Sequence, residues 1–250
     1  MSDSTDRVRQ RAAAFVARRG DALARRTAEA LVGGDPAGLE AWLSEVQRPD
    51  GGFPPDASIQ SARRAVGALL DVAVCESPTL GRACRFLEER QADCGGWRVG
   101  EEETSIRETG LLAGLLARSP FARADALDSA ADWLAARFSP ERVQGFAWDA
   151  IAAYGACFAN ILHDESDAIL QWCGRELQRG FQAKRFDAVR TGRVLAWCDA
   201  PSIPGGRLAA PLLVEAILAG QAVDGSWPAP DGVEPVEHVL DALAVLRRFA

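Results

Sequence analysis

The stretch FLEERQADCGGW, residues 86–97, decides the fold that this sequence predicts, because it recurs along the chain. It runs from a helix-like segment through Gln91 and a Gly-Gly turn to Trp97. Residues 42–53 read WLSEVQRPDGGF and residues 216–227 read AILAGQAVDGSW, and each has a glutamine six positions before an aromatic residue. One Gly-Gly pair is only a turn signal, but three copies with the same offsets indicate an internal repeat.

Two degenerate copies lie between these three, starting at Trp133 and Trp172, where Phe138 and Leu177 replace the glutamine. The glutamine-equivalent positions are then separated by 44, 47, 39 and 44 residues. Each copy is followed by a second, more apolar segment, whereas β-branched residues and strict alternation are scarce, so the unit is a helical hairpin. The sequence predicts one all-α domain over residues 1–250, with N-terminal helices in 1–33, broken at Gly20, and hairpins from about residue 38.

The two segments of each hairpin differ in composition. The second segments are dominated by small residues, which suits the tight packing of an inner ring. The first segments carry charges and bulky residues, which suits an outer ring; the bulky residues are Trp42, Phe86, Trp133 and Trp172.

The pattern FLxxxQxxxGGW resembles the QW repeat of squalene–hopene cyclases and other terpene cyclases, and related repeats occur in protein prenyltransferase β subunits. The resemblance covers nearly the whole chain and is closest over residues 86–97. It implies an α/α toroid of about six helical hairpins around a central apolar cavity. It also implies that Gln91 caps a neighbouring helix end, that Trp97 packs on the turn, and that the ligand is a small apolar, isoprenoid-like molecule.

Composition excludes several other classes. The net charge of −7 argues against a broad nucleic-acid surface, and no uncharged apolar run approaches the 18 residues of a transmembrane helix. The first 20 residues lack the apolar segment of a signal peptide, so a cytoplasmic protein is expected. Six cysteines without CxxC spacing predict neither a disulfide framework nor a CxxC zinc site.

The motifs of the resembling families are mostly missing. The acidic DxDD motif of protonation-initiated cyclases and the DDxxD motif that holds magnesium and diphosphate do not occur. His163 and His238 are the only histidines, and no aspartate–cysteine pair precedes His238, so we expect no metal and no cofactor. A prenyltransferase-like enzyme and a non-catalytic lipid-binding or scaffolding barrel remain alternatives to a terpene-cyclase-like enzyme.

Repeat phase places polar residues of the second segments at two levels. One level contains Ser58, Ser105, Asp187 and Glu234, and the next contains Ala62, Thr109, Thr191 and His238. Asp149 is the first candidate for a buried general acid, because its segment GFAWDAIAAYGACF is the most apolar and burial favours the protonated carboxyl. Asp187 is the second candidate, and His238 an auxiliary proton-transfer or hydrogen-bonding residue. The alternative for either aspartate is a helix N-cap.

The predicted binding residues come from the same segments. Trp148, Tyr154 and Phe158 are expected to shape the pocket with their aromatic faces, together with Thr109 and Thr191. Four arginines early in these segments are expected to ring one mouth of the barrel, where they can hold a diphosphate or carboxylate; they are Arg64, Arg107, Arg190 and Arg193. The alternative is a solvated or salt-bridged surface, since all but one of the basic residues are arginine.

Overall fold

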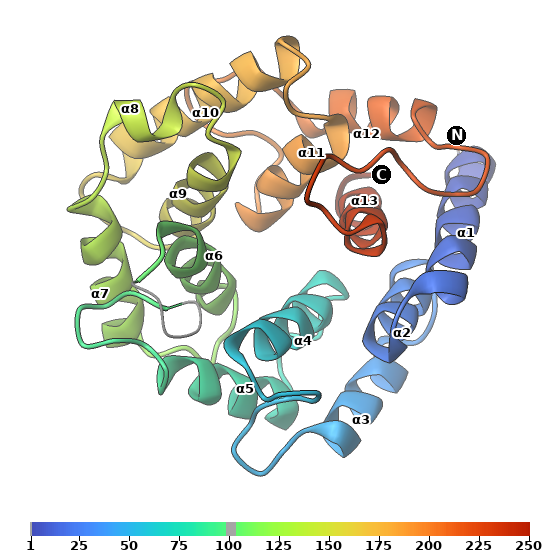
Figure 1. The fold of residues 1–250 in the computed structure, drawn as a ribbon, viewed down its shortest axis with the longest axis horizontal. Coiled ribbons are helices and arrows are strands. Elements are labelled where there is room, and N and C mark those ends of the chain that lie inside the picture. Colours follow the sequence, from blue (N-terminus) through green and yellow to red (C-terminus); the bar gives the residue numbers. More distant parts are fainter. Residues whose placement is uncertain (1, 99–103) are drawn as a thin grey trace.

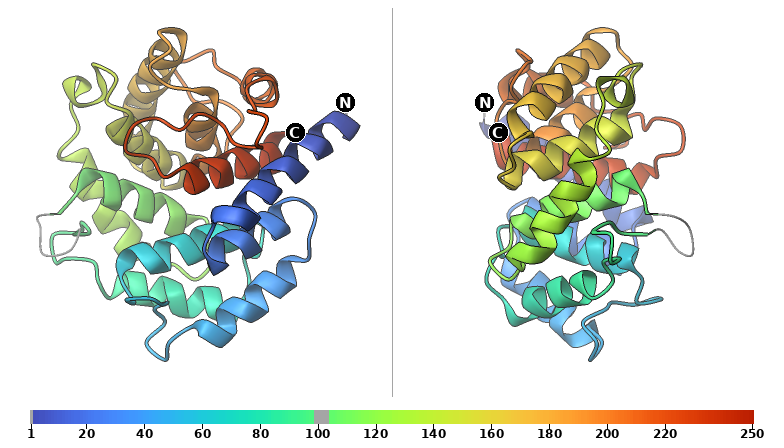
Figure 2. Two further views of the ribbon diagram at one scale, coloured as in Figure 1. Left: turned by 45° about the vertical axis from the view of Figure 1, so that its right-hand side comes forward. Right: turned by 90° about the vertical axis from the view of Figure 1, so that its left-hand side faces the viewer.

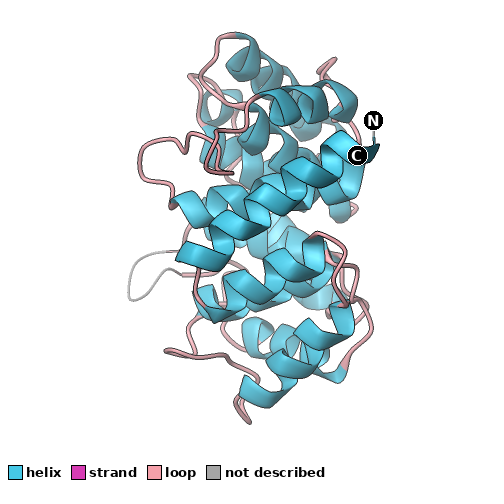
Figure 3. Ribbon diagram, turned by 90° about the vertical axis from the view of Figure 1, so that its right-hand side faces the viewer, coloured by secondary structure: helices cyan, strands magenta, loops and turns pink. Residues whose placement is uncertain are grey.

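The computed structural model describes residues 2–98 and 104–250, and within these ranges all regular secondary structure is helical. The ribbon contains helices and loops, with one isolated antiparallel bridge between Arg98 and Thr104 (Figure 3). The prediction of an all-α chain is therefore confirmed. None of the described helices combines the length and the apolar character needed to cross a bilayer.

The helices follow one another around a common axis in two layers (Figure 1). The outer layer contains α1 (Ser2–Arg19), α3 (Pro36–Val46), α5 (Pro78–Glu88), α7 (Ala124–Ala135), α10 (Ser166–Gln182) and α12 (Ala210–Ala219). The inner layer contains α2 (Ala22–Leu31), α4 (Ile59–Asp71), α6 (Ile106–Ala117), α9 (Trp148–Asn160), α11 (Ala188–Trp197) and α13 (Pro235–Phe249). Outer and inner helices alternate along the chain, with the short α8 (Pro140–Val143) between α7 and α9.

Three glutamines hold neighbouring hairpins together. Each Nε2 group donates to a carbonyl oxygen of its own glycine turn and to a carbonyl oxygen of the next outer helix. The bonds run from Gln47 to Gly51 and Thr79 (3.0 and 3.0 Å), from Gln91 to Gly95 and Ala126 (2.8 and 2.8 Å), and from Gln221 to Gly225 and Val8 (3.0 and 2.9 Å). Because Val8 belongs to α1, the last glutamine joins the C-terminal repeat to the first helix.

The two chain ends meet at this junction. Helix α1 lies across α13, and Nη2 of Arg9 donates to the carbonyl oxygen of Leu246 at 2.6 Å (Figure 2). Gly225 has a φ of 95°, and a Cβ there would strike the carbonyl oxygen of Arg11. Glycine is required at this turn because a side chain would push α1 away.

The tryptophans of the repeat connect each glycine turn to the helix before it. Trp97 and Trp227 are buried, and each Nε1 donates at 2.8 Å to a carbonyl oxygen ten residues earlier, that of Leu87 and of Ile217 respectively. A buried indole needs a partner for its N–H, and both copies supply it in the same way. The repeat motif therefore acts structurally, as the sequence predicts.

Small residues allow the inner helices to approach closely. A Cβ on Gly110 or Gly114 of α6 would strike the backbone of Ala153 or Ala156 of α9. The two helices are thus in backbone contact along one face, which agrees with the predicted inner position of the small-residue segments.

Repeat phase also correctly aligns the starts of the inner helices. Ser58, Ser105, Asp187 and Glu234 are the N-cap residues of α4, α6, α11 and α13. The residues of the next level are all buried; they are Ala62, Thr109, Thr191 and His238. Since all inner helices start on the same side of the ring, their positive N-terminal ends converge there.

Candidate functional site

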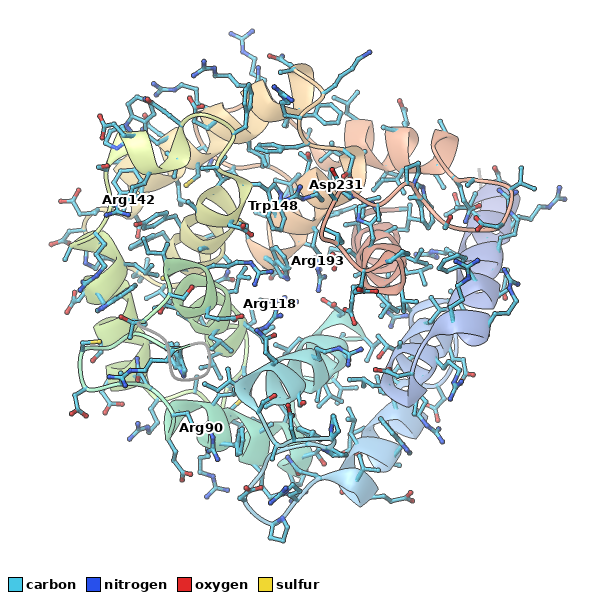
Figure 4. All side chains as sticks on the ribbon, viewed as in Figure 1. Arg90, Arg118, Arg142, Trp148, Arg193 and Asp231 are labelled. Carbon is cyan, nitrogen blue, oxygen red and sulfur yellow. The ribbon has the colours of Figure 1, made fainter. Side chains whose placement is uncertain are left out.

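A cavity of about 380 Å³ lies on the inner side of the inner helices. Each helix presents residues to it at intervals of three or four, which is one face of an α-helix. For example, α6 contributes Arg107, Leu111 and Leu115, and α11 contributes Arg190, Arg193 and Trp197. The side chains of Trp148 and Arg193 lie on the inner side of the ring (Figure 4).

The expectation of an apolar cavity is wrong. Besides leucine and tryptophan, the lining contains five arginines and four carboxylates: Arg63, Arg64, Arg107, Arg190, Arg193, Asp71, Glu234, Glu237 and Asp241. The residues of the inner helices that face the cavity pack against no further helix. Packing therefore does not require these residues to be apolar. The small and apolar residues of the inner helices are instead used between helices and between layers.

Ion pairs join three inner helices across the cavity. Arg193 of α11 donates to both carboxylate oxygens of Asp71 at the end of α4, Nη1 to Oδ1 at 2.9 Å and Nη2 to Oδ2 at 2.7 Å. Its Nε lies 2.8 Å from Oδ1 of Asp241 on α13. The guanidinium is only 9% exposed and is shared between two acids. Such a bidentate, shielded pair is stronger than a surface ion pair.

The two acids are not equivalent. Removal from bulk water raises the pKa of Asp241 to about 7; Arg193 opposes this shift, and the nearby Glu237 and Asp71 add to it. Burial disfavours the charged form of Arg193, but Asp71 and Asp241 outweigh burial and raise its pKa. At neutral pH the arginine is therefore charged, while Asp241 is partly protonated. Its side chain retains 30% exposure toward the cavity.

Most arginines at the N-terminal side of the cavity are paired. Arg64 contacts Asp21 (Nη1–Oδ2, 2.9 Å) and Glu237 (Nη2–Oε1, 2.7 Å). Nε of Arg107 donates to Oδ1 of Asp149 at 2.9 Å. Arg64, Arg107 and Arg190 thus lie near one mouth, as predicted, and the alternative of a salt-bridged surface holds for the first two. Arg193 lies deeper, beside the C-terminal end of α4.

Glu108, at the start of α6, is a buried acid that does not line the cavity. Nε2 of Gln60 donates to its Oε1 at 2.6 Å, and Nε of Arg63 lies 3.5 Å from its Oε2. Both partners belong to α4, so Glu108 pairs with a neighbouring helix.

Arg190 differs from the other cavity arginines. Its guanidinium carbon lies 4.1 Å from the ring centroid of Trp148, and it forms no ion pair within 4 Å to any carboxylate of the described residues. Burial lowers the pKa of Arg190, although Asp187 and Asp149 act at longer range to raise it. Nε1 of Trp148 is buried and has no hydrogen-bond partner in the described residues.

His238 is another cavity residue whose polar atoms lack hydrogen-bond partners. It is 1% exposed, and neither ring nitrogen has a hydrogen-bond partner among the described residues. Its Nε2 lies 3.8 Å from Oδ1 of Asp187, which is too long for a good hydrogen bond. Burial and Arg190 lower the pKa of His238, and Asp187 opposes them, so the ring is neutral at neutral pH.

Neither Asp149 nor Asp187 occupies the buried, cavity-facing position that was expected of a general acid. Asp149 is in the first turn of α9, but its side chain is 64% exposed and paired with Arg107, so the expectation of a buried acid is wrong there. It is not an N-cap either, because Ala147 takes that position. Asp187 is the N-cap of α11, with Oδ1 accepting from the Arg190 amide at 2.8 Å. For Asp187 the N-cap alternative is confirmed, and its Oδ1 lies 3.8 Å from Nε2 of His238.

The structure places four predicted binding residues away from the cavity. Tyr154 is buried toward the outer layer, where its hydroxyl donates to the Arg137 carbonyl oxygen at 3.1 Å and its ring stacks on Phe158. Oγ1 of Thr109 accepts from the amide of Trp97, and Oγ1 of Thr191 donates to the carbonyl oxygen of Asp187. None of these side chains lines the cavity, because helical phase turns them toward neighbouring helices. Trp148, Arg107, Arg190 and His238 do line it.

An open groove adjoins the mouth. It is lined by the turn before α9, including Phe146, and by Arg185 and Phe186, and it shares Trp148 and Arg190 with the cavity. Phe146 is exposed and packs edge-on against Phe186. This turn belongs to one of the two repeat copies that lack the glutamine, the copy with Phe138 in its place.

Three cavity acids, Asp71, Glu237 and Asp241, were not predicted from the sequence. A signal for Asp241 was present, since it lies three residues after His238 on the same helical segment, VEHVLDAL. Asp71 carried no such signal, because only the assembled ring brings the end of α4 next to α11.

Comparison with known proteins adds no assignment. No family model matches the chain, and a search of curated proteins finds no match. Within residues 2–98 and 104–250, no three histidine, cysteine or acidic side chains are grouped so as to hold a metal ion.

Proposed function

We propose that this chain is an α/α toroid whose central cavity is the active site of a terpene-cyclase-like enzyme. The reaction is acid-initiated isomerisation or cyclisation of a small apolar, isoprenoid-like molecule. The observation that carries the proposal is Asp241, a carboxyl group that faces the cavity and is partly protonated at neutral pH. The volume of about 380 Å³ lies near the lower end of the range typical of small-molecule sites.

The chemistry needs a neutral carboxylic acid next to an apolar wall. Asp241 transfers its proton to one carbon of a substrate double bond, which leaves a carbocation on the neighbouring carbon and a carboxylate on Asp241. Loss of a proton from an adjacent carbon back to Asp241 gives the isomer and restores the acid. Attack of a second double bond on the cation before that loss gives a ring.

The surrounding residues have supporting roles in this proposal. Trp148 and Trp197, with ring centroids 5.9 Å apart, present aromatic surfaces that stabilise a nearby cation. Arg193 holds the carboxyl in position and stabilises its ionised form after proton transfer. His238 keeps its auxiliary hydrogen-bonding role, Asp187 takes such a role in place of that of general acid, and exposed Asp149 no longer suits the role of general acid.

Two alternatives stay open. A non-catalytic ligand-binding ring is favoured by the ion pair between Asp241 and Arg193, because that contact alone is sufficient reason for an acid at this position. The prenyltransferase-like alternative requires a metal and a diphosphate substrate, and it predicts turnover that depends on added divalent cation.

Solvent-exchange measurements test the proposal even when the product is unidentified. Small isoprenoid alkenes, including their alcohol, acid and diphosphate forms, are incubated with the protein in D₂O, and deuterium incorporation is followed by mass spectrometry. Asp241→Asn is expected to reduce incorporation by about 10²–10⁴-fold, the usual contribution of a general acid.

Asp149→Asn is the matched control, since it makes the same substitution on an exposed acid near the mouth, and it should retain exchange. Loss of exchange in Asp149→Asn with retention in Asp241→Asn restores Asp149 as the acid. Absence of exchange in the native protein with every compound refutes the enzymatic proposal in favour of a binding ring.

A further inference from the structure

We infer that the mouth of the cavity binds the carboxylate of an apolar carboxylic acid, held by Arg190 with Trp148 and His238. This inference rests on the proposed function for the apolar character of the ligand, and it specifies the chemical class of that ligand. It follows from unpartnered donors, their positions and the local charge.

Three side chains at the mouth have hydrogen-bond donors without partners among the residues that the structure describes, and Oδ2 of Asp187 beside them is a buried acceptor without one. The guanidinium of Arg190 has neither an ion pair nor a side-chain hydrogen bond to a described residue. Nε1 of Trp148 and both ring nitrogens of His238 are buried without hydrogen-bond partners in the described part of the chain. Buried polar groups normally have partners, so a ligand that accepts hydrogen bonds explains Trp148 and His238, and the half-buried Arg190 beside them supplies a positive charge for it.

The positions of these side chains favour an anion. Trp148, Arg190 and His238 lie in the first turns of α9, α11 and α13, and all three line the same cavity. The N-terminal ends of inner helices carry partial positive charge, which favours an anion at this mouth. Leu111 and Leu115 continue the cavity wall on α6 and offer surface for an apolar chain.

The local charge balance distinguishes a carboxylate from a phosphate. Arg64, Arg107 and Arg193 already contact carboxylates, whereas Arg190 contacts no carboxylate of the described residues, and Asp187 and Asp149 act on it only at longer range. Glu234 and Glu237 also line the cavity. A singly charged ligand balances Arg190, whereas a phosphate monoester or diphosphate brings additional negative charge toward these acids.

The stacking geometry agrees with this choice. A guanidinium stacked 4.1 Å from an indole centroid keeps the N–H groups at its edge free for hydrogen bonds in its own plane. A carboxylate matches that planar arrangement with two oxygens. The neutral ring of His238 offers one further N–H donor.

Calorimetric titration of the full chain with octanoate, octyl phosphate and octanol tests the inference, because the three probes share one apolar chain. Octanoate is expected to bind at least ten times more tightly than either of the others. Arg190→Gln should weaken octanoate binding about 10- to 100-fold, as expected for a lost hydrogen bond to a charged group. Trp148→Phe, which keeps a ring but removes the N–H, should weaken it about 2- to 10-fold.

Arg175→Gln is the control, because Arg175 stacks on Trp172 of the outer helix α10 in the same manner at 4.7 Å. It should bind octanoate as the native protein does. Tighter binding of octyl phosphate, equal binding of octanol, or unchanged binding in Arg190→Gln overturns the carboxylate site. Binding is measured without turnover, so a confirmed site with no Asp241-dependent exchange refutes only the proposed function.

Discussion

Asp241→Asn should change the pH dependence of stability in a predictable direction. Folding raises the pKa of Asp241 from 3.8 to about 7, chiefly because the cavity removes the carboxyl from bulk water. Between these pH values the folded chain holds a proton that the unfolded chain has lost. Stability therefore falls as the pH rises through this interval, and it levels off above it. Asparagine, which has the same shape and no charge, lacks this dependence.

The magnitude follows from the same shift. At about 1.4 kcal/mol per pH unit, the interval corresponds to a ceiling of about 4 kcal/mol, of which about 2–3 kcal/mol falls between pH 5 and pH 8. Contact of the carboxyl with cavity water screens the charge, so the lower figure is the expected one. The stability of Asp241→Asn relative to the native protein should therefore rise by about 2 kcal/mol between pH 5 and pH 8.

Urea denaturation at pH 5, 6, 7 and 8 measures the effect, because the difference between the two proteins cancels groups that titrate equally in both. Asp71→Asn is the control: it removes the bidentate partner of buried Arg193 and should cost about 3–5 kcal/mol at pH 8. A difference between native protein and Asp241→Asn that does not change with pH refutes the reasoning. A fall in the relative stability of Asp241→Asn between pH 5 and pH 8 does the same.

Two further predictions concern the ring itself. Gln221→Ala removes the hydrogen bonds to Gly225 and Val8 and should cost about 1–3 kcal/mol of unfolding free energy in urea titrations, whereas Gln171→Ala on the exposed surface of α10 should change it by less than about 0.5 kcal/mol. Gly110→Ala places a methyl group against the α9 backbone and should lower the unfolding free energy by about 1–3 kcal/mol; Gly67→Ala, where a Cβ meets nothing, should raise it by up to about 1 kcal/mol. If the two variants of either pair change the unfolding free energy equally, the contacts described for Gln221 or Gly110 are wrong.

Much of the fold was predictable because its signals are local and repeated. The glutamine, the glycine turn and the aromatic residue interact within one copy and with the next outer helix, so their spacing alone reports the hairpin. The N-cap level was predictable for the same reason: Ser58, Ser105 and Asp187 bond to amides three residues later in their own helices. The bond from Gln221 to Val8 could not be predicted from local spacing, because it joins residues at opposite ends of the chain.

The candidate site was predictable only in part. Helical periodicity identifies which residues share a face of one helix, but the face that meets the axis depends on the rotation of each helix in the assembled ring. That rotation places Tyr154 and Phe158 in the outer packing and leaves Trp148 and Arg190 at the mouth. The apolar surroundings of Asp149 in the sequence were likewise uninformative, because its own side chain points to solvent.

The amino-acid sequence by itself determined the all-helical class and the hairpin repeat, since both depend on short-range spacing. Only the tertiary structure decided the character of the cavity. Asp71, Arg193 and Asp241 are far apart along the chain and meet because α4, α11 and α13 face one another across the axis. Burial at that meeting point, rather than any local motif, raises the pKa of Asp241 to about 7, and the same assembly leaves Arg190 stacked on Trp148 without an acidic partner among the described residues.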